Sequence, residues 1–538
     1  MADTPRFLIS DTNEKCQHYV LLSVSDKTGV IDLAHALDQA GYRIIATGGT
    51  GRALTEAGIP IAPISDFTGV EQLLGGRVKT LNPQISAGIL YRRDHAADLR
   101  DQATYKFPAI DIVVCNLYPF AETIQKPGVT LPEAVEQIDI GGVTLLREAA
   151  KNFAYCLAVC DPADYAEITE WLRQGEVTYE KRLQLALKAF QHVRDYDQTI
   201  AEYFAAQAEK TTEIFPEKIG WNLERHITLR YGDNPHQEAA LYLHHGNNGP
   251  LARLEWHGGR KPSATNVEDI DAGIRSVSLF TQPAAVIIKH NTPCGIALGD
   301  TAKEALARAI EADPLSAFGG VIVLNCSLDE DTAREIERFK REQGSGIDIV
   351  AATVIPEQSI GLLRETRKST GIYSFGALPP GGFNDPLVRA VNGGLILQSP
   401  DADTFHDPKN WRVVTQKFPA EDLWPRLKIA WDFIRRIRSN SVIVVDRELP
   451  MTRGIGTGQT ARVYAAEIAL KLAGEHACGA ILVSDGLFPF SDSIELAAQY
   501  QVATVIQPGG SVKDEAVIAA ANQHNMVMIF TGVRAFWH

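Results

Sequence analysis

The sequence predicts an α/β protein with more than one domain and a mostly parallel sheet in its first part. From residue 18 to about 160, short β-branched runs alternate with amphipathic stretches. A second series of alternating runs occupies the rest of the chain. Strands that alternate with helices are typical of parallel sheets covered by helices. The length of 538 residues also exceeds what one hydrophobic core accommodates.

In the first half, strands are expected in HYVLLSVS, YRIIAT, DIVVCNLYPF and YCLAVCDP, and helices in VIDLAHALDQAG and GRALTEAG. A long helix follows, because apolar residues keep three-and-four spacing at Leu183, Leu187, Phe190, Val193, Ile200 and Phe204. The polar stretch AQAEKTTEIFPEKIG breaks this pattern. It predicts a boundary at residue 212 between domains 1–212 and 213–538.

In the second half, strands are expected in AAVIIKH, GGVIVLN, DIVAATVIP, SVIVV, GAILVSDG and ATVIQP. Residues 377–420 are rich in Gly, Pro, Asn and Asp, which predicts two subdomains that divide near residue 380. No sequence repeat with a fixed period is visible.

Composition and charge favour a cytoplasmic enzyme that acts on small molecules. The net charge of -14 disfavours nucleic acid and anionic membrane as partners, so an anionic ligand needs a local cationic site. The seven cysteines include no CxxC pair, which fits reduced thiols and gives no cysteine-built zinc site. The first twenty residues contain no apolar export segment, and no apolar run approaches the length of a membrane span.

Two loops of the first half follow an expected strand and open an expected helix. Ser25, Asp26 and Lys27 stand in the first loop, and Thr47, Gly48, Gly49 and Thr50 form the second. Unpaired N–H groups at a helix start can hold a phosphate, and glycine lets the backbone approach it closely. Each loop alone is as often a plain helix cap.

Three further segments add polar groups that suit a nucleotide site. GGRVKTLNPQ contributes two cations and a hydroxyl, CNLYPF ends a strand with an amide and a phenol, and IDIGGVTLLREAAKN opens a helix. The side chains concerned are Arg77, Lys79, Thr80, Asn116, Tyr118, Asp139, Thr144 and Lys151. Cations and hydroxyls favour a phosphate or an oxyanion, although each could also be solvated surface.

In this order, SVSDKTG, TGGT, RVKT, CNLYPF and IDIGGVTLLREAAKN resemble the IMP cyclohydrolase domain of the bifunctional purine biosynthesis family. That domain has a fold similar to methylglyoxal synthase. The resemblance implies a proton-transferring Lys151, with Tyr118, Lys79 and Asp139 around the reacting amide. It implies these nucleotide contacts: Ser25, Asp26, Lys27, Thr47, Gly48, Gly49, Thr50, Arg77, Val78, Lys79, Thr80, Cys115, Asn116, Asp139 and Ile140.

The first half departs from the family pattern at two positions. Asn82 and Ser86 stand where the family usually has histidines. A nearby imidazole can tune a proton relay. An impaired cyclohydrolase domain and a nucleotide-binding regulator without turnover therefore stay open as alternatives.

The second half places a cation beside an imidazole at the end of a strand, in VIIKHNTPCG. The charge of Lys289 disfavours protonation of His290, which keeps His290 available as a base, and Lys289 can stabilise an oxyanion. The Pro-Cys pair is also found in zinc deaminases, whose signature continues P-C-x-x-C after H-x-E. Ala297 replaces the second cysteine and no H-x-E is nearby, so a metal-dependent deaminase is disfavoured.

Around this dipeptide, RYGDNPHQ, SNS, GIGTGQTAR and FPFSD resemble AICAR transformylase, the other half of the same family. The resemblance covers essentially residues 230–538 and implies two subdomains with a cytidine-deaminase-like fold that lack the metal. Catalysis is assigned to Lys289, His290 and Asn440, with His538 as a further candidate. The AICAR contacts implied are Arg230, Tyr231, Gly319, Asn440 and Arg534, and the folate contacts are Arg462, Val463, Asp492, Ser511 and Val512.

The resemblance implies the last two steps of purine biosynthesis. The 5-amino group of AICAR attacks the formyl carbon of 10-formyltetrahydrofolate, and formyl-AICAR then loses water to form IMP. It also implies a homodimer and a chemistry that requires no metal, with folate as the co-substrate. The sequence leaves open the kinetic constants, a monovalent-ion requirement and direct transfer of the intermediate between sites.

Overall fold

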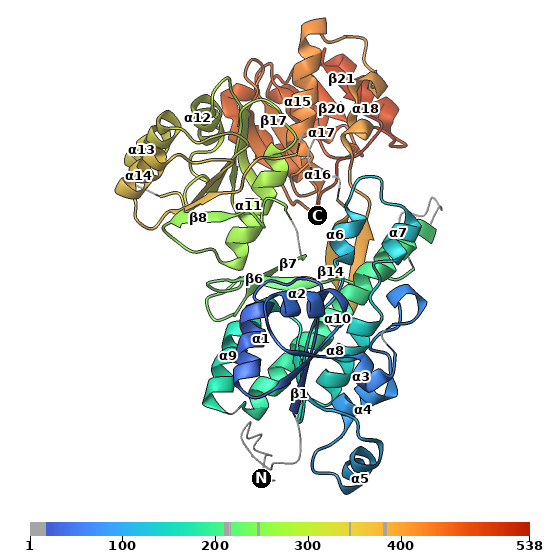
Figure 1. The fold of residues 1–538 in the computed structure, drawn as a ribbon. Coiled ribbons are helices and arrows are strands. Elements are labelled where there is room, and N and C mark those ends of the chain that lie inside the picture. Colours follow the sequence, from blue (N-terminus) through green and yellow to red (C-terminus); the bar gives the residue numbers. More distant parts are fainter. Residues whose placement is uncertain are drawn as a thin grey trace. The chain divides into compact units, whose positions relative to one another are not determined.

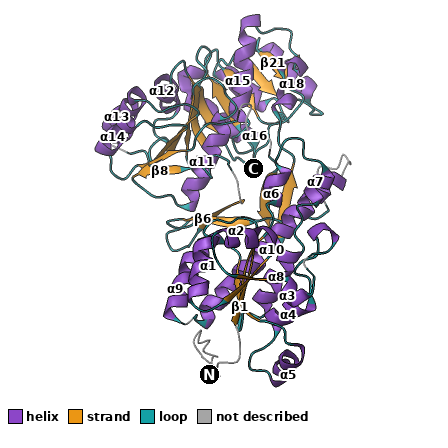
Figure 2. Cartoon of the chain, in the orientation of Figure 1, coloured by secondary structure: helices purple, strands orange, loops and turns teal. Residues whose placement is uncertain are grey.

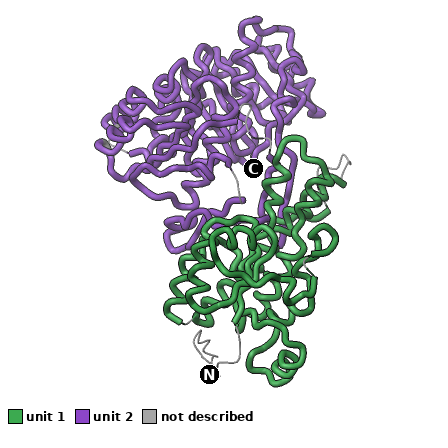
Figure 3. The backbone as a smooth tube through the Cα atoms, in the orientation of Figure 1, with its two compact units in different colours: residues 1–220 green, residues 221–538 purple. Residues whose placement is uncertain are grey.

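The computed structural model describes residues 18–70, 72–175, 177–208, 215, 217–244, 248–343, 346–379, 383 and 385–538. The chain forms two compact units, residues 1–220 and 221–538 (Figure 3). The boundaries predicted at residues 212 and 380 both lie outside the described residues, so their exact positions stay predictions. Within the described ranges, no helix combines the length and the hydropathy needed to cross a membrane.

Unit 1 contains a five-stranded parallel sheet in the order β3-β2-β1-β4-β5. Figure 1 shows β1 inside this unit with helices on both sides. Its strands are β1 (His18–Val24), β2 (Arg43–Ala46), β3 (Ile61–Pro63), β4 (Ala109–Asn116) and β5 (Leu157–Val159). Its helices are α1 (Val30–Gln39), α2 (Gly48–Glu56), α3 (Ser65–Thr68), α4 (Pro83–Leu90), α5 (Ala96–Tyr105), α6 (Phe120–Ile124), α7 (Leu131–Val135), α8 (Gly141–Lys151), α9 (Tyr165–Gln174) and α10 (Tyr179–Ala208). The predicted parallel sheet is therefore present.

Helices cover both faces of this sheet, because successive strand residues point to opposite sides. Val20 and Leu22 of β1 pack in one core cluster with α1 and α9. Leu21 packs on the other face, in a cluster with α4, α8 and α10. Because helices cover both faces of the sheet, its strands are continuous apolar runs in which polar and apolar residues do not alternate.

The long helix α10 is present, but of the apolar stripe predicted from the sequence only Val193 is buried. Leu183, Leu187 and Phe190 are 47%, 56% and 40% exposed. The helix instead buries small and aliphatic side chains one residue away, such as Ala186 and Ala189. The 3.6-residue period predicts a helix but does not decide which of two neighbouring stripes faces the core.

Unit 2 contains two six-stranded sheets, in the orders β10-β9-β11-β12-β13-β8 and β16-β21-β20-β19-β17-β18, and two hairpins. Figure 2 shows its strands in orange and its helices in purple. The first sheet region comprises β8 (Glu255–Gly258), α11 (Ala264–Val277), β9 (Ala284–Ile288), β10 (Pro293–Leu298), α12 (Ala302–Ala312), β11 (Val321–Leu324), α13 (Glu330–Gln343), β12 (Ile349–Ala352), α14 (Glu357–Thr366) and β13 (Gly371–Ser374). The hairpins are β6 (Leu223–Thr228) with β7 (Ala240–His244), and β14 (Leu387–Val391) with β15 (Gly394–Gln398).

The second sheet region repeats the element order of the first. It comprises β16 (Arg412–Val413), α15 (Trp424–Ile434), β17 (Val442–Val445), β18 (Thr452–Gly456), α16 (Arg462–Ala473), β19 (Ile481–Ser484), α17 (Asp492–Gln499), β20 (Thr504–Gln507), α18 (Asp514–Gln523) and β21 (Val527–Phe530). In each region an antiparallel hairpin is followed by three strands, the first antiparallel to the hairpin and the others parallel. The unit is thus a structural duplication without a visible sequence repeat.

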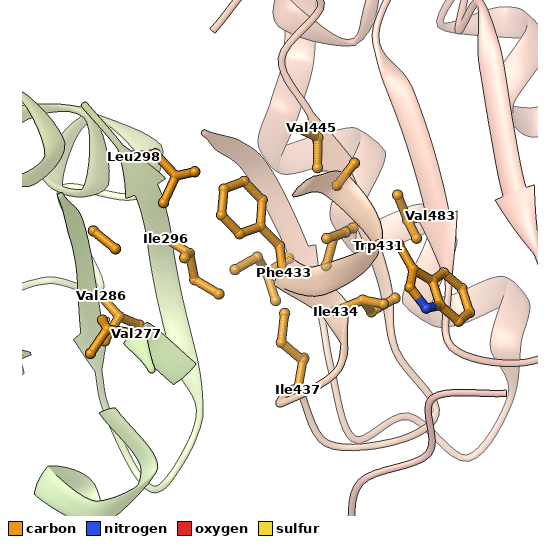
Figure 4. Packing of buried hydrophobic residues seen from close by; sticks show 14 of the residues in the cluster. Val277, Val286, Ile296, Leu298, Trp431, Phe433, Ile434, Ile437, Val445 and Val483 are labelled. Carbon is orange, nitrogen blue, oxygen red and sulfur yellow. The ribbon is translucent and has the colours of Figure 1, made fainter. Parts of the chain in front are cut away.

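The two sheet regions share one hydrophobic core and one edge contact. Val286 and Leu298 belong to the same cluster as Trp431 and Val483, with Phe433 of α15 between them (Figure 4). At the sheet edges, Ala297 of β10 forms an antiparallel bridge with Met451, the residue just before β18. These contacts fix the regions relative to each other, which matters because each contributes predicted site residues.

Candidate active sites

Unit 1 has a cavity of about 610 Å³ at the carboxyl ends of β1, β2 and β4. This is the edge at which parallel α/β sheets usually bind ligands. The lining residues that the sequence predicted are Ser25, Lys27, Thr47, Gly48, Gly49, Thr50, Arg77, Lys79, Thr80, Asn116, Tyr118, Asp139 and Ile140. The structure thus brings together side chains from five separate segments.

One part of the cavity is a cationic cradle at the start of α2. The Lys79 ammonium lies 3.6 Å from the position of a Cβ built on Gly48, and the Lys27 ammonium lies 3.7 Å from one built on Gly49. Gly48 also has a φ of 42°, which disfavours a side chain there. Two ammonium groups beside bare helix N–H groups are suited to a phosphate.

Asn116 shapes the first loop of this cavity. Its Oδ1 accepts hydrogen bonds from the backbone N–H groups of Ser25, at 2.6 Å, and Asp26, at 2.9 Å. Its Nδ2 donates to the Asp26 carbonyl at 2.9 Å. Asn116 therefore holds the loop in place with both ends of its amide.

The same cavity holds a buried carboxyl beside a phenol. Asp139 accepts a hydrogen bond from the Gly142 N–H at 2.7 Å. Burial raises the pKa of Asp139, while N–H groups of Gly142 and Tyr118 and the charge of Lys79 oppose this. Burial and the Asp139 charge raise the pKa of the Tyr118 hydroxyl. A carboxyl, a phenol and an ammonium are groups that can move or stabilise protons.

Three of the predicted nucleotide contacts do not line the cavity. The Asp26 carboxylate accepts hydrogen bonds from the N–H and hydroxyl of Thr28, at 2.9 and 2.7 Å, and these lower its pKa. Cys115 is buried in the core, where desolvation raises the pKa of its thiol. Val78 pairs with Leu73 instead.

Lys151 is not brought to the cavity either. It is the last residue of α8 and is exposed, whereas Gly141 and Gly142 at the other end of α8 line the cavity. At 1.5 Å per residue the two ends are about 15 Å apart. The proton-transfer role of Lys151 thus stays a prediction that the cavity geometry does not support.

The two departures from the family pattern also lie outside the cavity lining. Asn82 caps α4, because its side chain accepts a hydrogen bond from the Gln84 N–H at 2.9 Å. Ser86 forms a hydrogen bond with Glu148, a half-buried carboxyl whose pKa is raised by burial. The cavity itself keeps its cations, carboxyl and phenol.

Sequence reasoning missed several lining residues, among them Ser23 and Glu136. Ser23 forms a hydrogen bond with the Thr47 hydroxyl at 3.0 Å. Glu136 forms an ion pair with Arg77, and both side chains are more than half exposed. In the sequence, only the position of Glu136 just before the IDIGG segment could have predicted that it lines the cavity.

In unit 2, the other predicted residues gather at one end of the two joined sheets. Lys289 follows β9, and β9 runs antiparallel to β10. Asn440 precedes β17, which runs antiparallel to β18. Because β10 and β18 are antiparallel neighbours, the end of β9 and the start of β17 lie at the same end, three strand spacings or about 14 Å apart.

Lys289 and His290 occupy the turn between β9 and β10. The Lys289 ammonium donates to the Phe318 carbonyl at 2.8 Å, next to Gly319. His290 is exposed and has a φ of 58°. Asp269 of α11 accepts a hydrogen bond from the Asn291 N–H at 2.6 Å. Asp269 of α11 thus anchors the backbone of the turn that carries Lys289 and His290.

Arg230 and Tyr231 are attached to the start of the same helix. The Tyr231 carbonyl accepts a hydrogen bond from the Ala264 N–H at 3.0 Å. The Arg230 guanidinium donates to the Tyr231 hydroxyl at 3.0 Å. The backbone of Tyr231 is therefore tied to α11 less than two turns before Asp269.

The remaining predicted contacts follow the strands of the second sheet. Asp492 comes after β19, Ser511 and Val512 after β20, and Arg534 after β21, so parallel pairing places all of them at the carboxyl edge. Val463 is the second residue of α16, and His538 lies beside Phe536 with ring centroids 5.9 Å apart. Val512 is fully exposed.

Arg462 is a predicted folate contact whose side chain is largely buried, and its ligand role stays a prediction. It is only 8% exposed, and its guanidinium donates to the Ser484 hydroxyl at 2.9 Å and to Asn440 Oδ1 at 2.7 Å. Asn440 Nδ2 donates to the Gln459 carbonyl at 2.8 Å. The guanidinium is therefore engaged with Asn440 instead of facing solvent.

Comparison with known proteins adds an independent observation. The family model described as AICARFT/IMPCHase bienzyme matches residues 149–472, and the model described as MGS-like domain matches residues 29–144. A protein named bifunctional purine biosynthesis protein PurH from Anoxybacillus flavithermus is 43% identical over 520 residues, which cover 96% of this chain and 99% of that protein. Proteins of the same name from Sorangium cellulosum and Listeria monocytogenes are each 42% identical with the same coverage. A solved structure titled crystal structure of ForH is 42% identical and covers 35% of this chain and 98% of its own, with a TM-score of 0.33.

Proposed function

Because this chain belongs to the AICARFT/IMPCHase bienzyme family, we propose that its two units divide the two reactions of that family between them. The protein transfers a formyl group to the 5-amino group of AICAR and closes formyl-AICAR to IMP. In this proposal the cavity of unit 1 is the cyclohydrolase site. The strand ends around His290 and Asn440 in unit 2 form the transformylase site.

The observation that carries the cyclohydrolase assignment is the cationic cradle beside the buried carboxyl and phenol. Lys27, Lys79 and the start of α2 hold the phosphate of formyl-AICAR. The carboxamide nitrogen then attacks the formyl carbon, and water leaves as the ring closes. Holding both groups of one molecule close together supplies much of the rate. Tyr118 and Asp139 assist the proton transfers.

Formyl transfer needs a base and a cation at the attacked carbonyl. The AICAR amine is electron-poor, because its lone pair delocalises into the imidazole carboxamide. His290 accepts the amine proton while the new C–N bond forms, and Lys289 stabilises the oxyanion. The bond to the folate nitrogen then breaks, and tetrahydrofolate takes up a proton. In this proposal Arg230 and Arg534 hold the AICAR phosphate.

The family assignment implies a folate co-substrate. Our proposal specifies 10-formyltetrahydrofolate, bound at the edge formed by Asp492 and Ser511, and a chemistry without a metal. It further includes a cytoplasmic homodimer that acts on small molecules and not on nucleic acid. The dimer is testable by analytical ultracentrifugation of the purified protein.

The direct test of the cyclohydrolase assignment supplies synthetic formyl-AICAR to the protein without any folate. We expect rapid IMP formation that Lys27→Ala and Tyr118→Phe reduce and His290→Ala leaves unchanged. The regulator alternative predicts binding of formyl-AICAR without turnover. An impaired cyclohydrolase predicts IMP only at the uncatalysed rate.

A further inference from the structure

We infer that Asp485 is a positioning residue for formyl transfer, which holds Arg462 against the Asn440 amide and ties the segment of Arg534 to the same point. This inference rests on the proposed location of the transformylase site at Asn440. Asp485 follows β19 directly and is completely buried. In this proposal Asp485 does not itself contact the substrates and acts only through the residues that it holds.

Asp485 connects segments that are far apart in the sequence. Its Oδ1 accepts a hydrogen bond from Arg462, with which it forms a buried ion pair. Its Oδ2 accepts from the Ser441 N–H at 3.0 Å, one residue after Asn440. Its backbone carbonyl accepts from the Ala535 N–H at 2.9 Å. One buried residue thus fastens three segments of the proposed site.

Arg462 passes this constraint to Asn440. A guanidinium has only donors, so the Asn440 atom 2.7 Å from it is the amide oxygen. The amide nitrogen must then face the Gln459 and Thr460 carbonyls, at 2.8 and 3.4 Å. The Asn440 side chain is therefore held in one orientation.

The fold leaves space for this guanidinium at Gly486. A Cβ built on Gly486 would lie 2.4 Å from Arg462 Nη2 and 2.7 Å from the Phe536 ring. The Phe536 ring also stacks with Arg534, whose guanidinium carbon is 4.6 Å from the ring centroid. Glycine after Asp485 thus lets Arg462 reach both Asn440 and the segment that carries Arg534.

The test is Asp485→Asn in the full-length protein. The neutral side chain keeps the shape but loses the charge that holds Arg462. We expect kcat for formyl transfer to fall about 100-fold, since small displacements of reacting groups cost that much, while the KM for AICAR changes far less. IMP formation from formyl-AICAR in the same chain should stay at the wild-type rate, which serves as an internal control.

A matched control separates positioning from stability. Asp446 is also buried and binds the buried Arg453 at 2.6 Å in the same sheet region. We expect Asp446→Asn to lower the melting temperature about as much as Asp485→Asn but to leave kcat for formyl transfer unchanged. Equal kcat losses in the two variants would overturn the inference, and so would an Asp485→Asn enzyme within about twofold of wild type.

Two more variants keep the result decisive. Ser484→Ala removes one hydrogen bond to Arg462 and spares the ion pair with Asp485. If Asp485→Asn does not fold, a several-fold loss of kcat for formyl transfer in Ser484→Ala supports the positioning role. A wild-type kcat in Ser484→Ala would then overturn the inference. Asn440→Ala tests the proposed location of the transformylase site, which full formyl-transfer activity in this variant would contradict. If Asn440→Ala loses this activity while Asp485→Asn keeps it, only the positioning role of Asp485 is contradicted.

Discussion

The Lys289 ammonium is fixed 2.8 Å from the carbonyl oxygen of Phe318, across the gap between the β9–β10 turn and the loop before β11. The neighbouring His290 is exposed and has no such anchor of its own among the hydrogen bonds of the described residues. A tethered cation thus lies beside an accessible imidazole. In the proposed formyl transfer, His290 takes up a proton and Lys289 stabilises an oxyanion.

Replacing either group should therefore disable the second unit only. We expect His290→Ala and Lys289→Ala to reduce formyl transfer by about 100-fold or more. The assay follows tetrahydrofolate formation from AICAR and 10-formyltetrahydrofolate. Lys303→Ala, an exposed lysine on α12, is the matched control and should keep full activity. Normal turnover in His290→Ala would remove the proposed base.

Asp269 should matter through the turn that it holds. Its carboxylate accepts from the Asn291 N–H at 2.6 Å, and both His290 and Asn291 have positive φ values. We expect Asp269→Ala to lower kcat for formyl transfer several-fold because the turn loses its anchor. Asp271→Ala on the same helix is the control, since Asp271 pairs with Arg275 instead. Equal kcat values for these two variants would contradict the role of Asp269.

The cationic cradle of unit 1 should control substrate binding. We expect Lys27→Ala to raise the KM for formyl-AICAR about tenfold, as a charge-assisted hydrogen bond to phosphate is lost. Steady-state kinetics at several salt concentrations should show a weaker salt dependence in this variant. Lys126→Ala, an exposed lysine that does not line the cavity, should behave as wild type. An unchanged KM in Lys27→Ala would place the phosphate elsewhere.

Replacing Asp139 with asparagine should raise the stability of unit 1 and lower its activity. Its pKa is raised chiefly by burial, so the folded protein binds this proton more tightly than the unfolded chain does. The contribution to stability is present at low pH and is lost as pH rises through the folded-state pKa. We therefore expect Asp139→Asn to make unit 1 more stable than wild type at pH 7 and to slow IMP formation.

Thermal unfolding as a function of pH checks this sign. The stability difference between Asp139→Asn and wild type should vanish below the pKa of an exposed aspartate, about 3.9. Asp66→Asn, an exposed control on α3, should show no such difference. A less stable Asp139→Asn at neutral pH would mean that its hydrogen bonds outweigh its burial.

Asn82 should affect stability more than catalysis. As the cap of α4 it accepts the Gln84 N–H at 2.9 Å, and losing such a cap costs about 1 kcal/mol. Asn82→Ala should lower the free energy of unfolding of unit 1 by that amount, measured in urea. Asn82→Asp should retain the cap and serve as the control. Since Asn82 does not line the cavity, a large loss of cyclohydrolase activity with normal stability would contradict this interpretation.

Much of the fold and of the first site could be predicted from the sequence. Loops such as TGGT follow apolar strands, and parallel strands must end at a common edge, so Lys27, Gly48 and Tyr118 were expected to meet. Their joint presence in the cavity agrees with that reasoning. Which helix stripe is buried was less predictable, as Leu187 of α10 shows, because two neighbouring stripes are both apolar.

The other features of the fold and of the two sites depend on tertiary contacts that local sequence patterns do not encode. Lys151 shares a helix with the cavity residue Gly142, but helix length separates them. The family resemblance implied two similar subdomains in unit 2, but the residues show no repeat, since packing constrains topology more tightly than it constrains residue identity. The pairing of Arg462 with Asp485 could not be predicted from the sequence, because the two residues lie 23 positions apart and only the fold brings them together.

The central claim is that two separate sites in one chain carry out successive reactions, and a mixing experiment tests it most directly. His290→Ala protein and a Lys27→Ala/Tyr118→Phe double variant, which lacks both the phosphate contact and the proton-transfer phenol, are each supplied with AICAR and 10-formyltetrahydrofolate, alone and together, and IMP is measured. We predict little IMP from either variant alone and substantial IMP from the mixture, because formyl-AICAR made by the second variant is closed by the first. A mixture that forms no more IMP than the sum of the two variants would contradict the assignment of the reactions to separate sites.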